Sequence, residues 1–197
     1  MTIVYIVRHC QSLANARRMY NCTVRDDLGL SDAGKSQAWE LANYFSSRPV
    51  SRIYSSPFLR TRQTAAEIAK TTRAEIEIVD ELRELDCGQW SGRSEDEIRE
   101  KFPEAWKGWH FDPQNNPMPG GESLLSVQAR VLPKFESLVK KHEGECIMIV
   151  THYCVMNVLL CSLVSSLGNF RSFASKNGTV AEVSMENVPR LLGYRPL

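Results

Sequence analysis

The sequence predicts one α/β domain with three layers, in which helices cover both faces of a mostly parallel central sheet. Short apolar runs rich in β-branched residues alternate with segments of helical periodicity, which is typical of strands linked by crossover helices. The 197 residues lie within the usual range for one domain. No repeat, low-complexity tract or linker divides them, so we expect residues 1–197 to form a single domain with an excursion at about residues 94–121.

The balance of charges argues against several classes of partner. Lys and Arg number 24 against 23 Asp and Glu, and no basic block occurs, so we expect neither a nucleic-acid partner nor a membrane surface. No stretch approaches the roughly 18 apolar residues of a membrane span, and the opening apolar run is too short for a signal peptide. We expect a cytoplasmic protein; the sequence does not predict its oligomeric state.

The six cysteines are predicted to be reduced thiols. They are scattered along a chain without a recognisable export signal, so a disulfide framework is not expected. Cys10 and Cys154 are close in sequence to His9 and His152, but no C-x-x-C or H-x-x-x-H spacing supplies a local pair of zinc ligands. The sequence therefore predicts no metal site and no cofactor.

The first part of the chain is predicted to contain two strands and two helices. In order, the segments are a strand at residues 3–7, a polar loop to residue 30, a helix at 31–47, a strand at 51–55 and a helix at 57–72. Ser31 is a helix cap, and Leu41 and Phe45 fall on one apolar face at helical spacing. Ser56 is predicted to cap the next helix, with Pro57 at its first position.

The rest of the chain is predicted to alternate in the same way. In order, the segments are a strand at residues 74–79, an irregular stretch at 80–93, a short helix opened by a capping box at 94–97, a proline-rich excursion at 103–121, a helix at 122–142, a strand at 146–150, a helix at 153–167 and two strands within 170–185. The excursion has four prolines, two tryptophans and little periodicity, which favours an ordered loop. Asn177-Gly178 is a hairpin signal between the last two strands.

Two of the predicted strands are followed by a histidine. The first strand stops at Arg8 and His9, and the strand at 146–150 is followed by His152. Functional crevices of parallel sheets lie beyond the carboxyl ends of the strands, so these side chains are expected to face a ligand. Arg60, in the first turns of a helix that follows another strand, can approach the same edge. Two arginines and two histidines around one crevice suit a phosphoryl group.

A proton donor is also needed, because a leaving alkoxide must be protonated. The loop after the third strand offers Glu84 for this role. Arg62 follows Arg60 by two residues, about 200° around the helix, so both are not expected in one pocket.

Five sequence blocks resemble the histidine phosphatase superfamily, whose members have the phosphoglycerate mutase-like fold. In order, the blocks are R-H-C-Q-S-x-x-N at residues 8–15, S-P-x-x-R-x-x-Q-T-A at 56–65, L-x-E-x-x-x-G-x-W-x-G at 82–92, G-G-E-S at 120–123 and V-T-H at 150–152. The resemblance implies a metal-independent phosphomonoester hydrolase that acts on a small phosphorylated metabolite.

The resemblance also implies roles for individual residues. His9 would attack phosphorus to form a phosphohistidine, so one ring nitrogen must be unprotonated while the other donates to a backbone carbonyl. Arg8, Arg60 and a protonated His152 would hold the phosphoryl oxygens. Asn15 would be a neutral donor to the same oxygens.

Glu84 would protonate the leaving alkoxide and then accept a proton from the attacking water. Sugar phosphates, phosphoglycerates, α-ribazole phosphate and phosphoprotein all fit these residues. A phosphatase is expected rather than a cofactor-dependent phosphoglycerate mutase. The interval from Glu84 to His152 leaves little chain for a sealed lid, and Lys107 and His110 are the only basic residues of the proline-rich excursion.

Two departures from the family pattern, a match to another phosphatase motif and a non-catalytic alternative keep other interpretations open. Cys10 and Tyr153 occupy positions where the family often has glycine, which bears on the local backbone and on redox sensitivity. The stretch from Cys87 to Ser94 matches C-x5-R-S, the loop of thiolate phosphatases, although the charged residues 80–86 make a poor preceding strand. A non-catalytic module that binds phosphate could carry the same residues.

Overall fold

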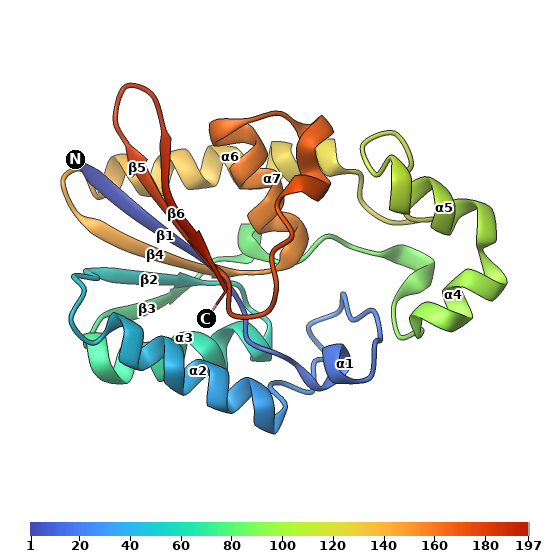
Figure 1. Ribbon diagram of the computed structural model, residues 1–197, viewed down its shortest axis with the longest axis horizontal. Coiled ribbons are helices and arrows are strands. Elements are labelled where there is room, and N and C mark those ends of the chain that lie inside the picture. The colour runs from blue at the N-terminus through green and yellow to red at the C-terminus, as the bar shows by residue number, and fades with distance from the viewer. Residues whose placement is uncertain (197) are drawn as a thin grey trace.

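The computed structural model describes residues 1–196 and contains a six-stranded sheet between two helical layers (Figure 1). The strands are β1 (Thr2–Arg8), β2 (Arg52–Ser55), β3 (Glu75–Ile78), β4 (Cys146–Thr151), β5 (Val180–Met185) and β6 (Arg190–Arg195). Their order is β3-β2-β4-β1-β5-β6. The first four strands are parallel to one another, β5 is antiparallel to β1, and β6 is antiparallel to β5. The predicted fold class, a three-layer domain with a mostly parallel sheet, is confirmed.

Each face of the sheet is covered by two helices. Figure 1 shows α2 (Asp32–Phe45) and α3 (Leu59–Thr72) on one side, and α6 (Leu124–Lys141) and α7 (Tyr153–Val164) on the other. β1 alternates between the layers, because Tyr5 packs with the α2–α3 core and Ile6 packs with the α6–α7 core. None of the helices within residues 1–196 is long and apolar enough to cross a membrane.

The excursion after residue 94 is more helical than predicted. The capping box at Ser94 opens α4 (Glu95–Lys101) as expected, but α5 (Pro103–Phe111) replaces the first half of the predicted loop. Pro103 fits the first helical position, where no backbone N–H is needed. Trp109 is buried against Phe170. In Figure 1 both helices extend away from the sheet.

The predicted hairpin around Asn177-Gly178 is wrong. Residues before this turn form a short 3-10 helix, η3 (Leu167–Ser172), and the antiparallel pair is β5 with β6. The Gly178 N–H donates to the Arg8 carbonyl at 3.2 Å, so the turn packs on the end of β1 instead of joining two strands. Its positive φ of 76° suits glycine at this position.

Three shorter segments also differ from the sequence-based expectation. The loop before residue 30 contains α1 (Leu13–Ala16), opened by a capping box between Ser12 and Asn15. The stretch at 80–93 contains two 3-10 turns, η1 (Asp80–Leu82) and η2 (Gly88–Trp90). α3 begins at Leu59 with Phe58 at the N-cap, and the Ser56 hydroxyl, predicted to cap this helix, contacts a histidine instead.

Candidate active site

His9 lies immediately beyond β1, beside the end of β4. Its backbone N–H donates to the Thr151 carbonyl at 2.9 Å, which holds it at the carboxyl edge of the sheet. Its Nδ1 is 2.7 Å from the Cys10 carbonyl, and Arg60 Nε donates to its Nε2 at 3.2 Å. A carbonyl only accepts and a guanidinium only donates, so the proton is on Nδ1 and Nε2 has a lone pair. This is the tautomer predicted for a nucleophile.

The surroundings of His9 keep the ring neutral. The side chain is 3% exposed. Burial, reinforced by the charges of Arg60 and Arg8, lowers the pKa of His9 well below its ordinary value. Nε2 is therefore unprotonated at neutral pH and available to attack phosphorus.

Arg60 is held by residues that the sequence analysis did not identify. Asp27 Oδ2 is 3.2 Å from Arg60 Nη1 and also accepts from the Arg60 backbone N–H at 3.0 Å. The Asn21 carbonyl accepts from Arg60 Nη2 at 3.1 Å. Asp27 and Asn21 belong to an irregular loop with no periodic pattern or motif to mark them. Arg62 is exposed, as its spacing from Arg60 predicted.

His152 is neutral and connects Arg60 to Ser56 through hydrogen bonds at its two ring nitrogens. Its Nδ1 accepts from Arg60 Nη2 at 3.2 Å, so the proton is on Nε2, which lies 2.7 Å from Ser56 Oγ. Burial, with the charges of Arg60 and its neighbours, lowers the pKa of His152 well below the ordinary value. The expectation of a protonated His152 therefore does not hold for the free site, and a bound phosphate dianion would be needed to raise its pKa.

Arg8 lies over the ring of Tyr153, with Cζ 5.2 Å from the ring centroid. One guanidinium nitrogen donates to the Ser175 carbonyl. Arg8 Nε is buried and has no hydrogen-bond partner within residues 1–196, which leaves a donor for a ligand. The side chain at position 153, where the family often has glycine, thus supports the Arg8 guanidinium.

Asn15 is oriented by two hydrogen bonds to its side-chain oxygen. Oδ1 accepts from the Ser12 N–H at 3.1 Å and from Asn177 Nδ2 at 3.0 Å. Asn177 Nδ2 also donates to the His9 carbonyl at 3.1 Å. Because its oxygen is occupied, Asn15 offers its amide N–H groups to the pocket that it lines.

Glu84 forms part of the same pocket wall. Its Oε1 accepts from the Leu85 N–H at 2.9 Å and from the Cys154 N–H at 3.2 Å. Burial raises the pKa of Glu84, against the opposing effect of these hydrogen bonds and of nearby Arg60 and Arg8. A raised pKa extends the protonated form toward neutral pH, as general acid catalysis requires.

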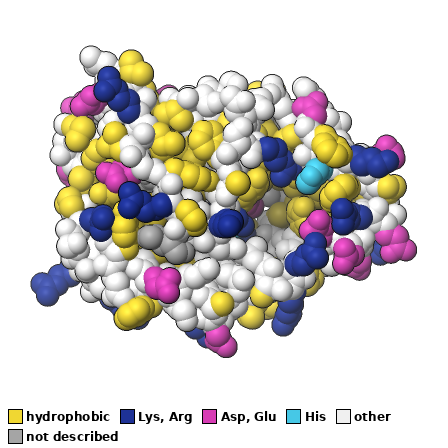
Figure 2. All heavy atoms as spheres, viewed as in Figure 1, with side chains coloured by type: hydrophobic (Ala, Val, Ile, Leu, Met, Phe, Trp, Pro, Cys, Tyr) yellow, Lys and Arg dark blue, Asp and Glu magenta, His cyan; other side chains and the backbone are white. Residues whose placement is uncertain are grey.

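These groups surround a cavity of about 280 Å³. Arg8, His9, Asn15, Arg60 and Glu84 all line it; His152 is behind Arg60. Figure 2 shows the hollow on the viewed face, with Lys or Arg side chains around its rim. Within residues 1–196 no three His, Cys, Asp or Glu side chains are grouped as metal ligands.

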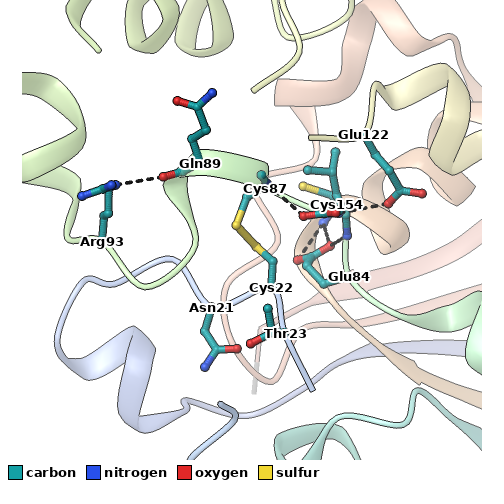
Figure 3. The surroundings of a disulfide bond; sticks show 12 residues. Asn21, Cys22, Thr23, Glu84, Cys87, Gln89, Arg93, Glu122 and Cys154 are labelled. Carbon is teal, nitrogen blue, oxygen red and sulfur yellow. Dashed lines mark hydrogen bonds between the residues drawn. A yellow bond between two sulfur atoms is a disulfide. The ribbon is translucent and has the colours of Figure 1, made fainter. Parts of the chain in front are cut away.

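The prediction of six reduced thiols is wrong for one pair. Cys22 and Cys87 form a disulfide beside the pocket, 65 residues apart in sequence and with Cα atoms 5.9 Å apart (Figure 3). It joins the loop that carries Asn21 to the loop that follows Glu84. Only the folded chain brings these loops together, so cysteine spacing did not reveal the pair.

Cysteine chemistry is not part of the site. Cys87 is buried and disulfide-bonded, and η1 rather than a strand precedes it, so the C-x5-R-S match is not a thiolate phosphatase loop. Cys10 is buried next to His9, and its N–H donates to Thr64 Oγ1 at 3.2 Å. Burial raises the pKa of the Cys10 thiol to about 12. The cysteine in place of the family's glycine is therefore an unreactive packed group.

The chain is similar to known phosphatases along most of its length. The histidine phosphatase superfamily (branch 1) matches residues 4–191. Phosphoserine phosphatase 1 of Hydrogenobacter thermophilus is 36% identical over 187 residues, which cover 94% of this chain and 88% of that protein. The metal-independent phosphoserine phosphatase of Arabidopsis thaliana is 32% identical over 163 residues, covering 81% and 67%. The solved structure of Bacillus stearothermophilus YhfR matches with a TM-score of 0.91 at 27% identity, covering 98% and 96%.

The likeness confirms two predictions made from the sequence blocks: the family, and a phosphomonoester hydrolase that works through a phosphohistidine. The chain belongs to the histidine phosphatase superfamily.

Proposed function

We propose that this phosphatase hydrolyses small phosphomonoesters with six residues in defined roles, and that O-phosphoserine is the first substrate to test. The proposed catalytic residues are His9, Glu84 and His152, and the proposed substrate-binding residues are Arg8, Asn15 and Arg60. The observation that carries the proposal is that the Nε2 lone pair of His9 and the Glu84 carboxyl share one cavity with the guanidinium groups.

The first step would transfer the phosphoryl group to His9. Nε2 forms a bond to phosphorus while the bond from phosphorus to the alcohol oxygen breaks. Arg60 Nε, which contacts Nε2 in the free site, would turn to a phosphoryl oxygen, and Arg8 Nε would find the partner that it lacks. The Glu84 carboxyl would give its proton to the leaving alkoxide.

The second step would release phosphate. Glu84, now ionised, takes a proton from a water molecule that attacks phosphorus as the bond to Nε2 breaks. His152 would gain a proton on Nδ1 when the phosphoryl dianion is bound, and Nδ1, once Arg60 has turned to the phosphate, would donate to a phosphoryl oxygen. Ser56 positions the His152 ring through the hydrogen bond to Nε2.

Hydrolysis is favoured over mutase activity because the proline-rich excursion at 103–121 supplies no free cation for a second phosphate. A mutase must retain a second phosphate while the intermediate turns round. In the proline-rich excursion Lys107 is paired with Glu104 at 3.0 Å, and His110 is stacked on Trp106. Neither forms a free cationic clamp. Two relatives named above are phosphoserine phosphatases, which supports O-phosphoserine as the first substrate.

We also propose that residues 1–197 act as one domain, with the excursion at 94–121 forming a wall of the site.

We further propose that the protein works in the cytoplasm and acts on a metabolite rather than on nucleic acid. The Cys22–Cys87 disulfide is relevant to the cellular compartment, because disulfides persist in oxidising surroundings. In a reducing cytoplasm the pair would be held as two thiols.

The test is phosphate release from O-phosphoserine with and without a chelator, combined with trapping of label from a phosphorus-labelled substrate. We expect chelator-insensitive turnover and a base-stable, acid-labile phosphoenzyme on His9. Loss of turnover with the chelator and recovery with added divalent metal would contradict the mechanism. 3-Phosphoglycerate with catalytic 2,3-bisphosphoglycerate tests the alternative: isomerisation much faster than phosphate release would identify a mutase.

A further inference from the structure

The pocket has two parts with different surroundings. The inner end consists of the proposed reacting and phosphate-binding groups Arg8, His9, Asn15, Arg60 and Glu84. The outer end consists of the remaining charged and large side chains of the pocket mouth, namely Arg18, Tyr20, Glu95, Trp109, Met118 and Arg171. If phosphate occupies the inner end, the alcohol of the substrate projects into the outer end. The outer end therefore selects the alcohol.

The two arginines of the outer end differ in their charge balance. Arg18 Nη2 is 3.1 Å from Glu95 Oε2, so a carboxylate already compensates its charge. Arg171 has no Asp or Glu oxygen within 4.0 Å in residues 1–196. Its charge is available to a ligand.

Arg171 is nevertheless held in a defined place. Its Nη2 donates to the Trp109 carbonyl at 2.7 Å. Its Cζ lies 5.6 Å from the centroid of the Trp109 ring and 5.7 Å from that of Phe170. The Trp109 carbonyl uses one donor and a hydrogen bond to the Tyr153 side chain uses a second, which leaves other guanidinium N–H groups for a planar acceptor such as a carboxylate.

Arg171 is also close to the inner end. The Phe170 ring contacts the Tyr153 ring at a centroid distance of 5.7 Å, and Tyr153 in turn supports Arg8. Burial raises the pKa of Tyr153, and the positive charge of Arg171 opposes that rise, so this charge acts across the outer end. One aromatic layer separates the uncompensated cation from the phosphate-binding arginine.

We propose that Arg171 is a specificity-determining residue that binds a carboxylate on the leaving alcohol of the substrate. The inference rests on the proposed function, because it takes the inner end as the phosphate site. Arg171 would favour phosphomonoesters of hydroxy acids or hydroxyamino acids over otherwise similar esters without a carboxylate.

The experiment compares O-phosphoserine, which has a carboxylate, with O-phosphoethanolamine, which lacks it but keeps the amine. Arg171→Met should lower kcat/KM for O-phosphoserine by about 10- to 100-fold, mainly through KM, as expected when charge-assisted hydrogen bonds are lost. The same variant should change kcat/KM for O-phosphoethanolamine by less than about threefold, and Arg171→Lys should recover part of the loss. Arg190→Met is the matched control and should leave both substrates unchanged, because Arg190 is an exposed arginine of β6 that does not line the pocket.

Two outcomes would overturn the inference. Equal losses on both substrates would mean that Arg171 only fastens η3 to α5 through the Trp109 carbonyl. No loss on O-phosphoserine would mean that its carboxylate is bound elsewhere or not at all. In either case the unmodified enzyme remains a phosphatase. Failure of the unmodified enzyme to hydrolyse all three of O-phosphoserine, O-phosphoethanolamine and phenyl phosphate would instead overturn the proposed function itself.

Discussion

The inner end of the pocket is centred on His9 at the ends of two adjacent parallel strands and completed from α1, α3 and the loop after η1, whereas the outer end is assembled from the segment after α1, the α4–α5 extension and η3. His9 and His152 directly follow β1 and β4, and the backbone bond from His9 to Thr151 ties them together. Arg18 and Arg171, by contrast, are exposed and come from the segment after α1 and from η3, neither of which directly follows a strand. The sheet thus positions the proposed nucleophile, whereas the outer end depends on loops and short helices.

The first prediction tests the inner end. His9→Ala should reduce turnover on every phosphomonoester by roughly 10⁴-fold or more, because the nucleophile takes part in both steps. Steady-state assays on an aryl and an alkyl phosphate measure the loss, and circular dichroism checks the fold. His110→Ala, an exposed histidine of α5, is the control and should retain activity. A His9→Ala enzyme with a substantial fraction of its turnover would contradict the mechanism.

The second prediction concerns the disulfide beside the pocket. Reduction of the Cys22–Cys87 disulfide should lower the free energy of unfolding by up to ~4 kcal/mol, the chain-entropy value for a loop of this length. Denaturant unfolding with and without a dithiol reductant measures the difference. The double variant Cys22→Ser with Cys87→Ser should unfold at one midpoint in both conditions. Equal midpoints for the unmodified protein would mean that the cross-link contributes nothing to stability.

The third prediction separates the roles of groups within the inner end. Glu84→Gln should slow an alkyl phosphate by about 10²-fold and a nitrophenyl phosphate far less, because a good leaving group needs no proton. The ratio of kcat/KM for the two substrates is the measurement. If both substrates slow equally, Glu84 positions the phosphate or shapes the pocket and does not act as the acid.

The smallest expected effect is on stability at mildly acid pH. The pKa values of His9 and His152 are lowered in the folded protein, so the unfolded chain binds more protons below its ordinary histidine pKa of about 6.5. The free energy of unfolding should therefore fall by about 1–2 kcal/mol between pH 7 and 5.5. The raised pKa of Glu84 acts in the opposite sense and reduces the fall.

Urea unfolding at the two pH values measures this change. His152→Ala should remove about half of the dependence, whereas a variant of the exposed His110 should leave it intact. An unchanged slope in His152→Ala would show that other groups cause the acid sensitivity. The outer end contributes little to this effect because its arginines stay charged throughout the range.

Sequence reasoning worked best where a signal was local. Short continuous apolar runs predicted β1 and β4, and Ser31 correctly marked the start of α2. Sequence reasoning was less successful where one local pattern is compatible with two different structures. Pro103 was taken as part of a loop although proline also begins helices, and Asn177-Gly178 makes a turn that packs on the end of β1.

By itself, the sequence predicted the strand-end histidines, the arginines proposed to bind phosphate and the carboxyl proposed as the general acid. Each could be found locally, because it lies at or shortly after the end of a predicted strand, and the residues that follow a strand face the crevice. Only the tertiary structure decided the Asp27 contact to Arg60, the Ser56 contact to His152 and the disulfide. These contacts join residues far apart in the chain, and the path of the intervening loops, which no periodicity records, brings them together.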